Sequence, residues 1–305
     1  MKLRIISSIL LTIATIGTTI TVPTQVHAQE TIPNEPSIKI ASLIATSGPT
    51  TKYAAIWQKD SNQKTFPSVA RHGMTSGQFQ SEFDKYVSRG YRLTSVSGSG
   101  SGRQTRYAAI WEKRSGPAWV TRYGMTSGQY QAEFNKYTQQ GFRLTHISGY
   151  GSGNNARYAA IWEKGSGPAW VAHHGMTSGQ YQSEFNKYTS QGFRLTQVSG
   201  YGTGNQARYA AIWEKRSGPA WVARHGMTSS QYQSEFNKYT SQGFRLTHVS
   251  GYGTGNQTRY AAIWEKRSGP AWVARHGMTS GQYQSEFNKY TDQGYQLIHV
   301  SGYGQ

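Results

Sequence analysis

The sequence predicts an α+β repeat protein of five units of about 51 residues, each a β-hairpin with a short third strand and a helix. Three strings recur five times: Tyr-Ala-Ala-Ile-Trp, Gly-Met-Thr-Ser, and strands resembling Phe-Arg-Leu-Thr-His-Val-Ser-Gly. The first string starts at Tyr53, Tyr107, Tyr158, Tyr209 and Tyr260. Repeats of this length indicate one supersecondary unit whose copies bury a core only against each other.

A β-hairpin is the first predicted element of each unit. Phe244–Tyr252 alternates and is rich in β-formers, which predicts a strand. Gly253–Thr258 is a turn, because Gly and Asn tolerate the positive φ values of tight hairpins. Arg259–Lys266 is the second strand, and its middle is apolar on both faces, as expected of a strand covered on two sides.

A third short strand follows over Trp272–His276, after a Ser-Gly-Pro turn. The tryptophans of the units stand at fixed repeat positions, where packing between units needs large aromatic side chains. We therefore expect most of them in the core. They are Trp57, Trp111, Trp162, Trp213 and Trp264 in one series and Trp119, Trp170, Trp221 and Trp272 in the other.

A helix completes the unit. Thr279 or Ser280 caps its start, and Gln282 three residues after Thr279 predicts a capping box. Gly294 supplies the left-handed stop. One stripe of the helix faces the core, at positions i, i+4 and i+7, and it consists of Tyr283, Phe287 and Tyr290.

The domain organisation follows from these elements. We expect a signal peptide over 1–28, a linker over 29–36, and one repeat domain over 37–305 with units of about 37–90, 91–141, 142–192, 193–243 and 244–294. The last strand, 295–305, has no partner after it, so it is expected to pair with the strand at Lys52. This pairing closes the array into a propeller-like ring without exposed sheet edges. An open solenoid, with a capping strand over Ser37–Thr46, is the alternative.

The N-terminal segment predicts export. Lys2 and Arg4 precede the apolar stretch Ile5–Val22, and Val-His-Ala ends a polar segment at Ala28, where cleavage is expected. The expected location is extracellular or periplasmic, with no membrane insertion after cleavage. The chain has no cysteine, which excludes thiol chemistry and Cys-ligated zinc.

The chain is strongly basic. Its 32 Lys and Arg less the leader's two leave 30, against 14 Asp and Glu, a net charge of +16 after cleavage. Such a field attracts polyanions without specificity. We therefore expect an extracellular polymer as the partner, anionic or neutral, either a polysaccharide or a protein. Charge alone is weak evidence for nucleic acid, which is not the expected partner.

No catalytic, metal or cofactor site is predicted. Gly-Tyr-Gly-Thr-Gly-Asn is followed by a strand, whereas a phosphate loop needs a helix there. Histidine recurs in two series, but Ser95 and Gln197 interrupt one series and Tyr123 the other, which disfavours a metal site. Identical carboxylates in successive units are expected to form ion pairs, and repetition favours multivalent contact over five equal active sites.

The predicted ligand-contacting residues lie around the hairpin tips. Aromatic rings displayed there stack on sugars or peptides, while polar neighbours supply hydrogen bonds. The alternative, that these tyrosines pack against the next unit, is equally consistent with the pattern. The candidates are Tyr150, Tyr201, Tyr252 and Tyr303, His146, His248 and His299, and Asn154, Asn205 and Asn256.

The strings Tyr-Ala-Ala-Ile-Trp, Gly-Pro-Ala-Trp-Val-Ala-Arg-His-Gly-Met-Thr-Ser, Tyr-Gln-Ser-Glu-Phe-Asn-Lys-Tyr and Gly-Phe-Arg-Leu-Thr-His-Val-Ser-Gly-Tyr-Gly resemble the repeats called bacterial tandem repeat domain 1. These repeats stand beside the catalytic domain of polyglycine hydrolase-like secreted serine hydrolases, and the resemblance covers about 37–305. It implies the structural repeats of that family.

The catalytic part of the family carries a Ser-x-x-Lys motif that opens a helix. Here Ser61 and Lys64 have that spacing, but they stand between predicted strands, and no stretch remains for a separate catalytic domain. The expected function is therefore a secreted, non-catalytic binding or adhesion module. The alternatives are an accessory or relic of a serine hydrolase, and a structural envelope protein.

Overall fold

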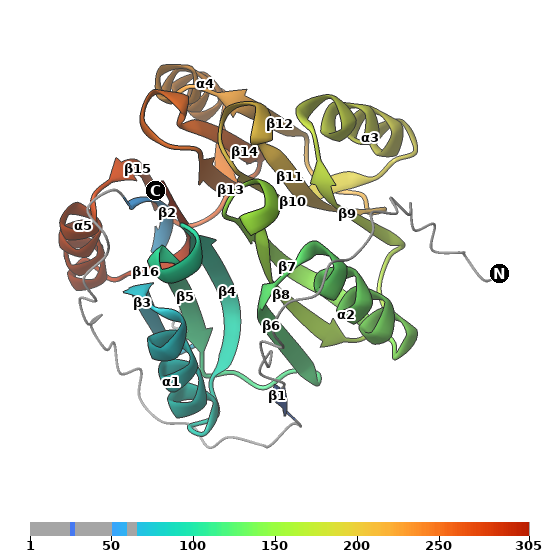
Figure 1. The fold of residues 1–305 in the computed structure, drawn as a ribbon. Helices are drawn as coiled ribbons and strands as arrows, with labels where there is room; N and C mark the ends of the chain where they lie inside the picture. The colour runs from blue at the N-terminus through green and yellow to red at the C-terminus, as the bar shows by residue number, and fades with distance from the viewer. Residues whose placement is uncertain (1–24, 28–50, 60–65, 305) are drawn as a thin grey trace.

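The computed structural model describes residues 25–27, 51–59 and 66–304. It contains five repeat units, each a three-stranded antiparallel sheet with one helix, in agreement with the predicted α+β class. The helices lie on the outside and the sheets point toward a common centre (Figure 1). Within the described residues, no helix has the length and apolar character needed to cross a membrane.

Each sheet has an outer, a central and an inner strand. The outer strands are β3 Ser68–Met74, β6 Trp119–Met125, β9 Trp170–Met176, β12 Trp221–Met227 and β15 Trp272–Met278. The central strands are β5 Arg106–Glu112, β8 Arg157–Lys164, β11 Arg208–Glu214, β14 Arg259–Lys266 and β2 Lys52–Lys59. The inner strands are β4 Arg92–Ser99, β7 Phe142–Tyr150, β10 Arg194–Tyr201, β13 Phe244–Tyr252 and β16 Tyr295–Tyr303.

The remaining elements connect these strands. The helices are α1 Ser76–Val87, α2 Ser127–Gln139, α3 Ser178–Ser190, α4 Ser229–Ser241 and α5 Ser280–Asp292. Short 3-10 turns join inner to central strands, namely η1 Gly102–Gln104, η2 Gly153–Asn155, η3 Gly204–Gln206 and η4 Gly255–Gln257. A further strand, β1 Gln25–His27, pairs with the outer edge of β6.

The last sheet takes strands from both ends of the chain. Inner strand β16 pairs with β2 from Tyr295–Lys59 to Tyr303–Lys52, and outer strand β15 pairs with the other edge of β2. The predicted pairing of the last strand with the strand at Lys52 is therefore confirmed.

A complete sheet spans, for example, residues 68–112, so the unit boundaries expected near 90, 141, 192 and 243 fall inside sheets.

The five sheets remain separate and do not merge into a barrel. Instead, each inner strand meets the next through side chains. Its outward backbone N–H at Gly98 or an equivalent glycine donates to a serine hydroxyl of the following inner strand. The series continues from the last inner strand to the first, where Gly302 N–H donates to Ser97 Oγ at 2.9 Å. Side chains thereby satisfy strand edges that would otherwise be open.

The outer strand is longer than predicted. It continues from His276 to Met278, and its pairing shifts register between Arg275 and Met278. Gly277 has φ 70°, so this shift is a bulge that only glycine adopts without strain. The bulge directs the chain from the strand into helix α5.

The helices form as the sequence indicates. Thr279 accepts from the backbone N–H of Gln282, and the Gln282 side chain accepts from the Thr279 backbone N–H, so the capping box is confirmed. All five helices have the same box. Gly294 follows α5 with φ 80°, as expected for the stop signal. The predicted helix stripe of Tyr283, Phe287 and Tyr290 is buried.

Aromatic side chains fill the space between each helix and its sheet. The five tryptophans of the central strands are fully buried, which confirms their expected place in the core. Trp264, for example, lies 5.3 Å from Tyr239, measured between ring centroids. The outer-strand tryptophans differ: Trp119 is buried, whereas Trp170, Trp221 and Trp272 are half-buried.

Ion pairs join the units at the end opposite the 3-10 turns. Arg92, Arg143 and Arg194 each contact a glutamate of the next sheet at 3.3 Å, and those glutamates are Glu163, Glu214 and Glu265. The helix glutamates pair with the outer strand, as Arg275 does with Glu286 at 3.3 Å. The predicted ion-pairing role of the repeated carboxylates is confirmed for these residues.

Candidate functional site

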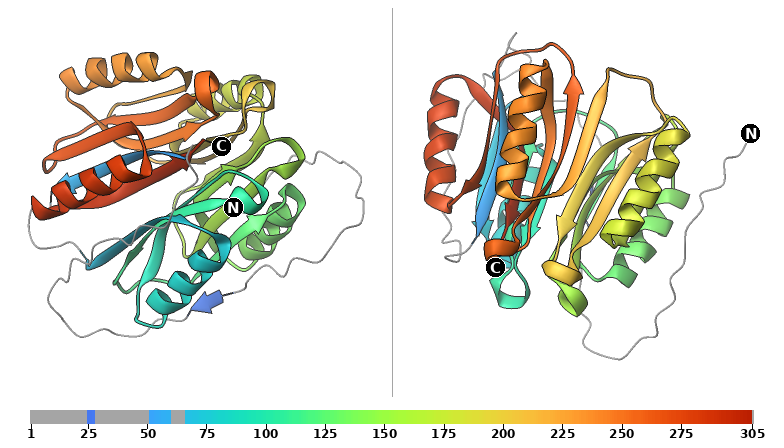
Figure 2. Two further views of the ribbon diagram at one scale, coloured as in Figure 1. Left: turned by 60° about the vertical axis from the view of Figure 1, so that its left-hand side comes forward. Right: turned by 90° about the horizontal axis from the view of Figure 1, so that it is seen from above.

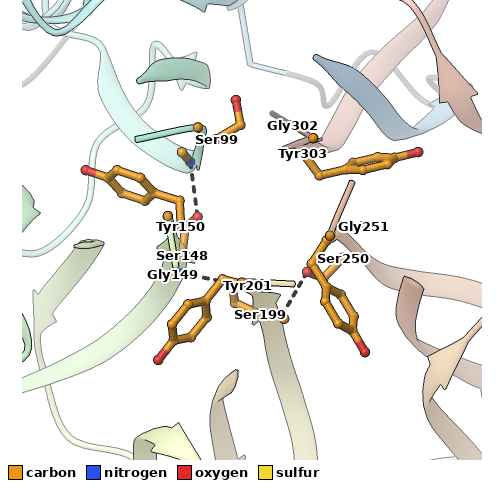
Figure 3. Close-up of a pocket in the computed structure, with 18 of the residues that line it drawn as sticks. Ser99, Ser148, Gly149, Tyr150, Ser199, Tyr201, Ser250, Gly251, Gly302 and Tyr303 are labelled. Carbon is orange, nitrogen blue, oxygen red and sulfur yellow. Dashed lines mark hydrogen bonds between the residues drawn. The ribbon is translucent and has the colours of Figure 1, made fainter. Parts of the chain in front are cut away.

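A cavity of about 80 Å³ lies at the centre, where the five inner strands end. Figure 3 shows this cavity surrounded by equivalent residues of all five units. The lining segments have the pattern Ser-Gly-Tyr-Gly-Ser/Thr, with serine in place of tyrosine in the first. They are residues 97–101, 148–152, 199–203, 250–254 and 301–304.

Five serine hydroxyls line the inner part of this cavity. Each serine side chain is more than nine-tenths buried, and each oxygen accepts a hydrogen bond from a glycine N–H of the preceding unit. The N–O distances lie between 2.9 and 3.1 Å. The residues of this serine ring are Ser97, Ser148, Ser199, Ser250 and Ser301.

The four tip tyrosines are not displayed to solvent, which corrects the expected placement. Each is 3% exposed, and Figure 3 shows the rings of Tyr150, Tyr201 and Tyr303 directed away from the cavity. The ring of Tyr252 lies against Gly200 of the preceding unit. The alternative reading, packing between units, therefore describes Tyr150, Tyr201, Tyr252 and Tyr303.

The tyrosine hydroxyls complete the contact between units. Tyr260 and Tyr303 share a hydrogen bond of 2.7 Å, and the backbone N–H of Gly277 donates to Tyr303 Oη at 3.0 Å. Burial raises the pKa of Tyr303 well above its ordinary value. The phenol is therefore neutral at physiological pH, and its polar atom is already occupied.

The tyrosine series has one exception, Ser99, which stands where the other units have tyrosine. It lies at the contact between the fifth and first units, where Gly302 has Tyr53 and Ser99 as its nearest neighbours. The departure from the pattern therefore marks the place where the last inner strand meets the first.

The predicted histidines lie one layer below the serine ring and do not line the cavity. The Nε2 atoms of His146, His248 and His299 lie 2.7–2.8 Å from backbone carbonyls of preceding inner strands. Ser95 and Gln197 occupy the equivalent positions, and Gln197 donates to Thr145 O at 2.9 Å.

Burial controls the charge of these histidines. It lowers the pKa of His146 and His299 to about 4, and that of His248 well below the usual value. All three are therefore neutral at pH 7. In the structure these histidines join the edges of neighbouring inner strands. They do not lie at the hairpin tips, where ligand contact was expected.

The predicted asparagines are exposed on the 3-10 turns. The backbone oxygens of Asn154, Asn205 and Asn256 accept from the arginine three residues later, at 3.0–3.2 Å. These bonds hold a cation beside each turn. We call the end of the molecule that carries η1–η4 the turn face; inner strand β16 also ends there (Figure 2).

The turn face is positively charged. Its connecting segments 99–106, 150–157, 201–208 and 252–259 contain five arginines and no Asp or Glu. Lys52 begins the central strand of the fifth sheet at the same end, opposite Tyr303. The helices also begin near this end, since the outer strands run toward it, and none has an acidic residue in its first turn. Helix N-termini add further positive potential.

Sequence reasoning missed the serine ring. The signal was present, because Ser-Gly stands at this position in all five units, whereas tyrosine follows in only four. The pattern predicts only a place in the hairpin strand for this serine, and no ligand-contacting role. Within the described residues, no group of three or more His, Cys, Asp or Glu is arranged to hold a metal ion.

The fold and the cavity define a tandem-repeat α+β module whose units meet around one axis. The polyglycine hydrolase-like structural repeat family matches residues 67–114, 116–165, 167–216, 218–267 and 269–305. The chain belongs to this family. The first four matched segments each contain the outer strand, helix, inner strand and central strand of one sheet, and the fifth contains the outer strand, helix and inner strand of the last sheet.

Proposed function

We propose that the chain is an exported, non-catalytic binding module that recognises an extracellular polymer at its turn face. The observation that carries this proposal is the axial cavity. It is lined by hydroxyl groups and backbone atoms and lies at the positively charged end of the molecule. The N-terminal segment supports export through its signal-peptide pattern.

The arrangement favours one ligand segment on the axis over five separate sites. We propose that the units form a closed propeller-like ring, supported by the pairing of β16 with β2 and the bond between Gly302 and Ser97. Equivalent groups of five units then surround a single point. A polymer end or loop that enters there meets all five units at once, and the outer parts of the turn face contact the flanking residues.

The chemistry of the turn face suits a polar polymer. Exposed Asn154, Asn205 and Asn256 supply amide donors and acceptors, and the arginines beside them attract negative charge. The aromatic stacking expected from the tip tyrosines does not contribute, since their rings are buried. An anionic polysaccharide therefore fits better than a neutral one.

A non-catalytic role is supported by the carboxylates. Glu163, Glu214 and Glu265 are engaged with arginines of neighbouring units at the end opposite the cavity. The Ser61–Lys64 spacing falls in residues 60–65, outside the described part of the chain, as do the predicted leader's residues 1–24 and 28, the linker 29–36 and the Ser37–Thr46 capping strand.

The test is retention of the mature protein on immobilised polymers over a salt series. We expect retention on an acidic polysaccharide at salt concentrations that release the protein from DNA, because non-specific phosphate contacts weaken steeply with salt. If the protein is released from all polymers at the same salt concentration, non-specific charge attraction would explain the whole of the binding. No retention at any salt concentration would favour a structural envelope protein or an accessory of a hydrolase.

A further inference from the structure

We propose that the serine ring binds a single oxyanion, a carboxylate, sulfate or phosphate group, on the central axis. The inference rests on the proposed function in that this group would belong to the bound polymer. The ring residues are Ser97, Ser148, Ser199, Ser250 and Ser301, all lining the cavity.

The hydrogen bonds of the ring leave its donors unused. Each serine oxygen already accepts from a glycine N–H, so the hydroxyl hydrogen must point elsewhere. Among the described residues, Ser148, Ser199, Ser250 and Ser301 have no acceptor within hydrogen-bond distance. Ser97 has Gly302 O at 3.4 Å, which is long for a hydroxyl donor.

Four hydroxyl donors without an acceptor, and a fifth with only a long one, select the kind of ligand. A water molecule accepts about two hydrogen bonds, so one water on the axis satisfies at most part of the ring. A carboxylate offers about four acceptor sites, and phosphate and sulfate offer more. Hydrogen bonds from hydroxyls to an ionised oxygen are also stronger than those to neutral acceptors.

The surroundings favour negative charge at this point. The lining segments contain no Asp or Glu, and the tyrosines behind them are kept neutral because burial raises their pKa values. At the same end, Arg157, Arg208 and Arg259 are each fixed by two backbone carbonyls. These cations place a positive field around the opening.

The glycine amides bonded to the ring provide a direct readout in the unmodified protein. Sulfate, phosphate and acetate are titrated separately at constant ionic strength, with chloride as the balancing anion, and glycine-labelled amide resonances are followed by NMR. We expect saturable shifts of the resonances of Gly98, Gly149, Gly200, Gly251 and Gly302. Shifts that do not saturate, or that spread over surface glycines such as Gly128 and Gly179, would overturn the proposal.

Substitutions of a ring serine separate the effect of its hydroxyl on binding from the effect of the positive charge of the turn face. Ser250→Ala should lower the sulfate affinity by about tenfold, since one hydrogen bond to a charged group is lost. Ser250→Thr keeps the hydroxyl and should keep most of the affinity. Ser190→Ala is the control, because its Oγ donates to Lys187 O on the far end of α3. Circular dichroism and thermal melting establish that each variant is folded.

The two proposals fail in different ways. If sulfate binds at the glycine amides but the protein is retained on no polymer, the oxyanion site stands and the proposed function is wrong. If the wild type and Ser250→Ala are retained equally on an immobilised acidic polysaccharide, and free sulfate does not compete, the proposed function stands and the oxyanion site is wrong.

Discussion

The ring of Tyr252 covers Gly200 so closely that a β-carbon at Gly200 would lie 2.3 Å from the tyrosine Cδ1 atom. The same relation joins Gly98 to Tyr150, Gly149 to Tyr201 and Gly251 to Tyr303. In each case, a residue without a side chain in one inner strand receives the aromatic ring of the next. This contact, together with the neighbouring serine–glycine bond, defines how consecutive units meet.

Replacing the covered glycine tests this contact. Gly200→Ala forces the Tyr252 ring to move and should reduce the free energy of unfolding by about 3 kcal/mol, the upper range for overpacking. Gly179→Ala is the control, since no atom lies within 4 Å of its added β-carbon in helix α3. It should be neutral or stabilise by less than about 1 kcal/mol. Urea denaturation measures both, and equal stability of the two variants would contradict the contact.

The hydroxyl and the ring of Tyr252 are separable. Tyr252→Phe keeps the ring over Gly200 but removes the hydrogen bond with Tyr209. It should cost about 1 kcal/mol of unfolding free energy, whereas Tyr252→Ala should cost about 3 to 5. Below the melting temperatures, Tyr252→Phe should be retained on polymers as the wild type is. Loss of retention by this folded variant would restore a ligand-contacting role for the tyrosine.

The contact between the fifth and first units lacks the tyrosine, and we expect it to open first. The Gly302 amide donates to Ser97, as the Gly200 amide donates to Ser250. Gly200 is covered by a tyrosine ring, whereas Gly302 has Ser99 in the place of that tyrosine. Amide hydrogen exchange at Gly302 should therefore be faster than at Gly200 under native conditions. Equal protection at the two amides would show that the missing ring has no effect on local stability.

The buried histidines predict sensitivity to acid. Burial lowers the pKa of His146 and His299 to about 4, whereas the unfolded chain takes up these protons near the ordinary value of 6.5. The unfolded state therefore binds more protons between about pH 6.5 and 4. Stability falls as the pH falls through that window, by about 3 kcal/mol for each such histidine.

Glutamine already replaces histidine at this position in one unit, as Gln197. A variant with His146, His248 and His299 changed to Gln should unfold at lower pH than the wild type and match it near pH 7. Part of the acid sensitivity should remain, because burial also lowers the pKa of His72 and His174 to about 4. Coincident acid-unfolding curves, measured by fluorescence, would contradict this account.

Local structure was largely predictable from the sequence. The inner and central strands, the capping box at Thr279 and the aromatic stripe of α5 follow from alternation, side-chain hydrogen bonding and the helical period. The pairing of β16 with β2 followed from counting strands, since the last strand lacked a following partner. These inferences need only neighbours in sequence or a count of repeats.

The site was harder to predict because its contacts join different units. A tyrosine next to a turn glycine indicates exposure when only its own hairpin is considered. Its actual neighbour, Gly98 for Tyr150, belongs to the preceding unit, and periodicity within one unit carries no information about that contact. The same holds for the serine ring, whose geometry exists only when all five units surround the axis.

The fifth sheet has a consequence for synthesis. Strand β2 is synthesised before the other four sheets, yet its partners β15 and β16 follow all four of them in the chain. The outer, central and inner strands of each of the other four sheets come from contiguous sequence, so these sheets are able to fold in order while β2 waits. The fifth sheet is therefore completed only after the other four have been synthesised, and a nascent chain that has not yet reached Tyr295–Tyr303 has one central strand without its inner neighbour.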